Sequence, residues 1–101
     1  MTQAKIDIPK DKIEDFCKRW KIAEFSIFGS ALRDDFSPRS DIDVLISFEP
    51  DFPWSLFDWI DMIEELKGIL GREVDLVEKS GLRNPFRRHE ILNNRQVIYA
   101  A

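Results

Sequence analysis

The sequence has few of the features that mark disulfide-bonded, secreted or membrane proteins. It has one cysteine, Cys17, which excludes an intrachain disulfide. It has no apolar run long enough to span a bilayer, and its first residues have no apolar stretch of the signal-peptide type. We therefore expect a protein of the cytoplasm with no membrane partner.

An excess of positive charge is also absent. Lys and Arg number 15 against 19 Asp and Glu, which gives a formal net charge of −4. Proteins that bind nucleic acid by neutralising its phosphates usually carry a basic patch or a basic overall balance. We therefore expect no direct binding to nucleic acid.

Apolar residues are plentiful. They form 44% of the 101 residues, which predicts a globular core and a single domain over residues 1–101. The three Trp and eight Phe are expected mostly in the core, with some on a partner surface. Cys17 is expected in the core, and His89, the only histidine, at the surface.

The hydrophobic periodicity predicts an α/β (α+β) fold. Helical spacing marks residues 10–20, 55–70 and 85–93, and strand-like runs mark residues 22–28, 41–48, 73–77 and 96–100. Ser55 and Asp58 predict a capped start for the longest helix, and Gly71 predicts its end. The apolar stripe of that helix is expected to comprise Leu56, Trp59, Ile60, Ile63, Leu66 and Leu70. The order α-β-β-α-β-α-β predicts a short sheet with helices packed on it.

A glycine and a serine follow the first predicted strand. Gly29 would let the chain turn sharply and let a ligand approach the main chain. Ser30 and the amides of a helix beginning there would suit a triphosphate. An ordinary turn without function is the alternative, because Gly and Ser are common turn residues.

Three aspartates stand on predicted strands. Asp41 and Asp43 are two residues apart, so their carboxylates point to the same face, while Ile42 points to the core. Such a pair repels itself unless a cation lies between, and its hard oxygen atoms suit Mg²⁺ or Mn²⁺. Asp75 lies within the third strand and could face the same ions or serve as a base. The alternatives are solvated acids at a strand end and a charge that protects a sheet edge.

Taken together, these features resemble a known family. The segment FGSALRDDFSPRSDIDVLI is similar to the signature of the polymerase-β-like nucleotidyltransferases, in which Gly-Ser is followed after ten residues by Asp-x-Asp. More narrowly it resembles the minimal nucleotidyltransferase (MNT) domains, the antitoxins of HEPN–MNT toxin–antitoxin pairs. The resemblance implies the palm fold of this superfamily, a short mixed sheet flanked by helices.

The resemblance also implies roles for particular residues. Asp41, Asp43 and Asp75 would be the catalytic carboxylates and would hold two Mg²⁺ ions, or Mn²⁺. Nucleotide phosphates would be bound by Gly29, Ser30, Arg33 and Ser40. Ala31 and Asp34 stand where many relatives have an arginine and a glycine, a change of charge that opposes phosphate binding.

The activity implied is the transfer of AMP from ATP to a tyrosine of a HEPN ribonuclease toxin. The exposed candidates for binding that partner are the aromatic residues Phe52, Trp54 and Phe57 and the basic residues Arg83, Arg87, Arg88 and His89. The basic residues could instead form a solvated helix face or hold the triphosphate. The alternative functions are an antitoxin that blocks its toxin by contact alone and an enzyme that modifies a small molecule of the aminoglycoside type.

Overall fold

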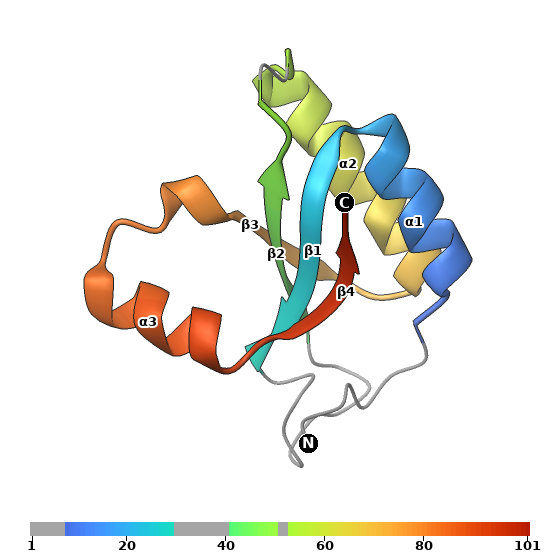
Figure 1. The fold of residues 1–101 in the computed structure, drawn as a ribbon. Helices are drawn as coiled ribbons and strands as arrows, with labels where there is room; N and C mark the ends of the chain where they lie inside the picture. The colour runs from blue at the N-terminus through green and yellow to red at the C-terminus, as the bar shows by residue number, and fades with distance from the viewer. Residues whose placement is uncertain (1–7, 30–40, 51–52) are drawn as a thin grey trace.

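The computed structural model describes residues 8–29, 41–50 and 53–101, and within them it forms a mixed sheet flanked by helices (Figure 1). The helices are α1 (Lys10–Arg19), α2 (Leu56–Leu70) and α3 (Pro85–Asn93). The strands are β1 (Ile22–Phe28), β2 (Ile42–Phe48), β3 (Val74–Glu78) and β4 (Gln96–Ala100). The predicted order of helices and strands is confirmed, and the short 3₁₀ turn Lys79–Gly81 is a feature that the periodicity did not indicate.

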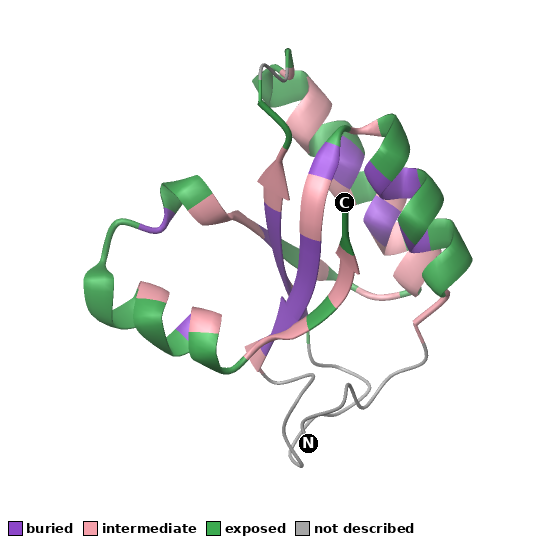
Figure 2. Cartoon of the chain, viewed as in Figure 1, coloured by how far each residue is buried: buried purple, intermediate pink, exposed green. Residues whose placement is uncertain are grey.

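The sheet has the strand order β3-β2-β1-β4. β1 pairs antiparallel with β2 and with β4, whereas β2 and β3 are parallel. Parallel strands need a crossover connection, and α2 supplies it between β2 and β3. The two central strands are therefore β1 and β2, and Figure 2 shows that buried positions run along both of them.

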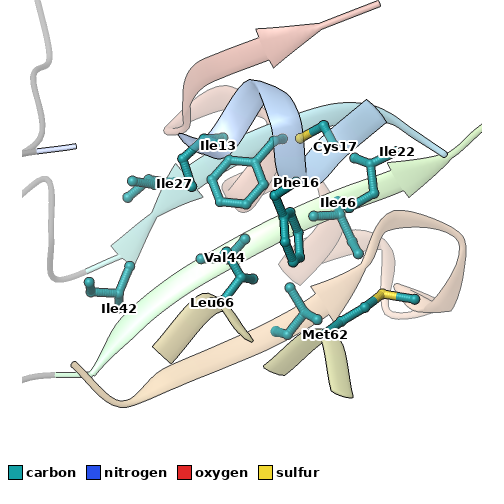
Figure 3. Close-up of a cluster of buried hydrophobic side chains, with 12 residues drawn as sticks. Ile13, Phe16, Cys17, Ile22, Ile27, Ile42, Val44, Ile46, Met62 and Leu66 are labelled. Atoms are coloured by element: carbon teal, nitrogen blue, oxygen red, sulfur yellow. The ribbon is translucent and has the colours of Figure 1, made fainter. Parts of the chain in front are cut away.

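Helices α1 and α2 cover one face of the sheet. The alternate residues Ile42, Val44 and Ile46 of β2 are fully or almost fully buried there (Figure 3). They meet Ile13, Phe16 and Cys17 of α1 and Met62 and Leu66 of α2. The expected burial of Cys17 and of the apolar face of the first helix is thereby confirmed.

The ends of α2 are capped as expected. The Ser55 hydroxyl accepts a hydrogen bond from the backbone N–H of Asp58, and the Asp58 carboxylate accepts one from the Ser55 N–H. Gly71 ends the helix in a left-handed conformation at φ 68°. The expected apolar stripe is partly wrong, because Leu56 and Ile60 are exposed and Met62 takes a core position instead.

Helix α3 lies on the opposite face of the sheet (Figure 1). Its Ile91 and the preceding Leu82 form a second, smaller core with Phe28 and Leu45. The Asn84 side chain caps the start of the helix by accepting hydrogen bonds from the N–H groups of Phe86 and Arg87. Both faces of the central strands are thus covered, and α3 lies on the face without α1 and α2.

The tryptophans belong to the framework. Trp54 donates a hydrogen bond from Nε1 to the carbonyl oxygen of Trp20 at 2.7 Å, and the two rings meet edge to face with centroids 5.0 Å apart. Trp20 in turn donates to Glu65, which also accepts from Arg19. These contacts join the end of α1 to α2 and its preceding segment.

No helix in the described part of the chain has both the length and the apolarity to cross a bilayer.

Candidate functional site

Two of the predicted catalytic aspartates are neighbours across two strands. In the parallel pairing of β2 with β3, Asp43 lies directly beside Asp75. On its other side Asp43 pairs with Phe28, the last residue of β1. Asp41 stands immediately before β2, two residues from Asp43. The end of one strand and the beginnings of two others therefore gather these carboxylates at one edge of the sheet.

The two neighbouring aspartates also share a face of the sheet. Side chains alternate along a strand, and Ile42 and Val44 on either side of Asp43 point to the core beneath α1 and α2. In β3, Val74 and Leu76 on either side of Asp75 pack into the same core. Asp43 and Asp75 consequently lie on the face that carries α3. Asp43 is half-buried, while Asp41 and Asp75 are exposed to solvent and to a ligand.

Gly29 borders the carboxylate of Asp43. Its φ is +72°, in the left-handed region that favours glycine. A Cβ built on Gly29 would lie 3.1 Å from Cγ of Asp43 and would overlap the Oδ2 atom of that carboxylate. Glycine is therefore required here both for the turn after β1 and for the place that the Asp43 carboxylate occupies.

Two carboxylates at this edge could bind a magnesium ion, but no third protein ligand in the described part of the chain is close enough to complete a cluster. Among the described residues, no three His, Cys, Asp or Glu side chains lie close enough together to hold a metal ion. Mg²⁺ usually binds through one or two carboxylates, with water and substrate phosphate completing its octahedron. The neighbouring carboxylates of Asp43 and Asp75 fit that pattern, with Asp41 close in the chain.

Several predicted nucleotide-binding residues lie outside the described part of the chain. They are Ser30, Arg33 and Ser40, together with the departures Ala31 and Asp34. The predictions for them stand as the sequence made them. Of the predicted phosphate contacts only Gly29 is described, and it lies at the same sheet edge as Asp43.

The structure changes the set of partner-binding candidates. Trp54 is wrong as an exposed anchor, because it is half-buried and bonded to Trp20. Arg88 is also held within the chain, since its Nη1 donates to the carbonyl oxygen of Lys79 at 3.1 Å. Phe57 is exposed as expected, and Phe52 lies outside the described residues.

The remaining basic residues, Arg83, Arg87 and His89, are exposed as expected. Phe86, which the sequence did not predict as a partner-binding residue, is 85% exposed. Its place in the helix could have indicated this, because Ile91, which is buried, is five helical steps further on, a rotation of about 140° around the helix axis.

Comparison with known proteins agrees with the geometry. The family model described as a nucleotidyltransferase domain matches residues 10–98. The protein adenylyltransferase MntA of Thermococcus cleftensis is 37% identical over 82 residues, which cover 81% of this chain and 78% of that protein.

Solved structures with low sequence identity share the fold. A toxin–antitoxin structure with AMP-PNP matches with a TM-score of 0.73 at 17% identity, over 93% of this chain and 75% of that one. An MNT antitoxin in complex with a tri-AMPylated HEPN toxin of Shewanella oneidensis matches with a TM-score of 0.60 at 18% identity, over 91% and 70% of the two chains. Both likenesses support the palm-type architecture that the motif implied.

Proposed function

The chain belongs to the nucleotidyltransferase domain family, and from this premise we propose that it is an antitoxin that transfers AMP from ATP to a tyrosine of a HEPN ribonuclease toxin. The relative named protein adenylyltransferase supports a protein as the acceptor. The structural neighbours with AMP-PNP and with an AMPylated HEPN toxin support the nucleotide and the partner. The modified toxin would be neutralised, and the pair would act in the cytoplasm.

The observation that carries this proposal is the pairing of Asp43 with Asp75 on one face, beside Gly29. Two neighbouring carboxylates, one half-buried and one exposed, can share a divalent cation between them. Phosphoryl transfer also needs charge neutralisation and positioning more than covalent chemistry from the protein. A divalent cation held by these carboxylates would therefore also neutralise the phosphate charge during transfer.

Asp43 and Asp75 would hold Mg²⁺, with Asp41 two residues away in the chain as a further candidate ligand. When bound, the ion supplies a Lewis acid that neutralises the phosphate charge. Gly29, Ser30, Arg33 and Ser40 would hold the phosphates of ATP in line with the acceptor. The tyrosine oxygen forms the new bond to the α-phosphorus, and the bond to pyrophosphate breaks. Asp75, the more exposed of the paired carboxylates, would accept the phenolic proton.

The HEPN protein itself would position the acceptor tyrosine, because this small domain offers few residues for that purpose. The strands and helices of this small domain are already used to build the sheet and the edge that carries the carboxylates. We therefore propose that residues 1–101 form one minimal domain whose site is completed by the HEPN protein. The contact would also place the target tyrosine within reach of the α-phosphate.

The test is label transfer with two forms of ATP. The chain is incubated with Mg²⁺ and with the HEPN protein that the proposal expects the adjacent gene to encode, using ATP labelled at either the α- or the γ-phosphate. We expect label on the HEPN protein from the α-position only, loss of that label with EDTA, and loss of ribonuclease activity in step with labelling. Label from the γ-position, or none from either, would contradict AMP transfer.

A second candidate is an antitoxin that blocks its toxin by contact without catalysis. The lack of a three-ligand metal cluster among the described residues favours it. In that case the HEPN protein would form a tight complex and lose its ribonuclease activity without label. Asp43→Asn would then neutralise the toxin as well as the original chain does, whereas the enzymatic proposal predicts that it would not.

A further inference from the structure

The most exposed large apolar side chain that the structure describes lies on α3. Phe86 is 85% exposed, although it stands one residue into a helix whose opposite side packs on Phe28 and Leu45. A phenylalanine in that position contributes nothing to the smaller core. An exposed aromatic ring beside charged residues is typical of a protein interface.

Two arginines close to Phe86 in the sequence differ from the other arginines of the framework. Arg19 is bonded to Asp15 and Glu65, and Arg95 to Glu24. The guanidinium groups of Arg83 and Arg87, in contrast, are exposed and have no hydrogen-bond or ion-pair partner within the described part of the chain. They give the area of α3 and the segment before it two exposed positive charges, beside exposed His89 and Glu90, on a chain whose net charge is −4.

Helix stability does not explain the charge of Arg87. The first turns of α1 and α2 carry Asp11 and Asp58, which suit the positive end of the helix dipole. The first turn of α3 has no acidic residue and carries Arg87 instead. A residue that breaks a local rule in this way without a partner indicates a role in binding.

The position of α3 relates this area to the carboxylates. Helix α3 lies on the face of the sheet toward which Asp43 and Asp75 point, as the packing of Ile91 on Leu45 and Phe28 requires (Figure 1). A macromolecule bound to the outer side of α3 would therefore be held on the same side of the sheet as the site of transfer.

We propose that Arg83, Phe86, Arg87 and His89 form the docking surface for the acceptor protein, which presents an acidic rim around an apolar recess for Phe86. This inference rests on the proposed function and adds the surface and the chemistry of its partner. A protein is favoured over RNA because the area combines one anchoring aromatic ring with few cations on an acidic chain. The exposed residues Leu56 and Phe57 of α2 have acidic neighbours, Asp58 and Asp61, in place of arginines, and they serve as the comparison.

The binding test uses matched pairs of variants and no ATP. Association of the full chain with the neighbouring HEPN protein is followed by surface plasmon resonance at two salt concentrations. Arg87→Glu should lower the association rate about tenfold at low salt and weaken its salt dependence. Phe86→Ala should raise the dissociation rate about tenfold. The controls are Lys12→Glu, the same charge change on exposed α1, and Phe57→Ala, a ring that is 78% exposed on α2.

Unfolding would not explain these losses. A glutamate in the first turn of α3 agrees with the helix dipole, and alanine at an exposed helical position is a good helix former. Circular dichroism and AMP-PNP affinity of each variant should match those of the original chain. Weaker AMP-PNP binding by Arg87→Glu would assign the arginine to the nucleotide and overturn the proposal.

The remaining outcomes distinguish a failure of the proposed docking surface from a failure of the proposed function. If the original chain labels the HEPN protein and all four variants bind it equally well, the function stands and this surface is wrong. If only Phe57→Ala loses binding, the partner docks on α2 and the proposal is overturned. If the original chain binds a fluorescent single-stranded RNA and Arg87→Glu abolishes that binding, the surface serves RNA instead.

Discussion

The carboxylate of Asp43 occupies the space that a side chain on residue 29 would need, and Gly29 leaves that space free. A Cβ on Gly29 would overlap Oδ2 of Asp43 and lie 3.1 Å from its Cγ. The two residues are separated by a long connection in the chain but lie at the same end of the β1–β2 pair. The glycine of the Gly-Ser pair thereby positions a carboxylate in addition to turning the chain.

Gly29→Ala should lower AMP transfer about 100-fold, because displacing a catalytic group by about 1 Å has an effect of that size. Gly71→Ala is the matched control, since Gly71 has nearly the same φ, +68°, and no atom within 4 Å of the Cβ position. Both variants should lose about 1–3 kcal/mol of unfolding free energy through backbone strain. Single-turnover transfer and urea denaturation measure the two effects, and equal transfer by both variants would contradict the positioning role.

Asp75→Asn should stabilise the chain in the absence of divalent cations. Neighbouring like charges on adjacent strands repel, so removing one should raise the unfolding free energy by about 0.2–1 kcal/mol. Mg²⁺ at several times its dissociation constant should stabilise the original chain by about 1 kcal/mol and leave Asp75→Asn unchanged. Thermal denaturation with and without MgCl₂ measures both effects. Asp61→Asn, an exposed acid on α2, should keep the full response to Mg²⁺, and an equal response in Asp75→Asn would refute the assignment.

Ser26→Ala should stabilise the protein. Ser26 is fully buried on β1, and among the described residues its Oγ has no hydrogen-bond partner. A buried hydroxyl without a partner costs about 1–3 kcal/mol, and alanine fills nearly the same space without that cost. Urea denaturation should show a higher midpoint with an unchanged slope. A lower midpoint would mean that the hydroxyl is satisfied in solution.

The stability of the protein should fall in alkaline solution because of Cys17. Burial raises the pKa of its thiol from 9.0 to about 12, so the folded chain keeps a proton that the unfolded chain releases. The stabilisation is complete below pH 9 and decreases as pH rises toward 12, by up to about 1.4 kcal/mol per pH unit. Urea denaturation between pH 8 and pH 10 should show a smaller decrease for Cys17→Ala. Equal decreases in the two proteins would exclude this thiol as the cause.

Much of the fold could be predicted because local patterns match it. Residues such as Ile42, Val44 and Ile46 alternate along a strand, and Ser55 and Gly71 mark the ends of α2 by their own chemistry. Leu56 and Ile60 were misplaced because periodicity shows that a helix has an apolar face without showing how far the sheet extends along it. Strand order was likewise invisible, since no local pattern states that β2 pairs with both β1 and β3.

Some features of the candidate site could be predicted from residue spacing, whereas others depend on how distant strands pair. The spacing of Asp41 and Asp43 predicted a shared face, but the pairing of Asp43 with Asp75 depends on strand register. The overlap of Gly29 with the Asp43 carboxylate depends on atomic positions that residue spacing does not determine. Trp54 and Arg88 looked like interface anchors because composition alone does not reveal a hydrogen bond to a distant carbonyl oxygen.

The most direct test of the paired carboxylates is the single-turnover rate of AMP transfer to the HEPN protein in Asp43→Asn and Asp75→Asn, measured beside Asp61→Asn. Each asparagine keeps the shape of the side chain and removes its charge, so folding and docking should persist. We predict that transfer falls at least 100-fold in the first two variants and is unchanged in the third. Transfer at the original rate by Asp43→Asn or by Asp75→Asn would contradict the account.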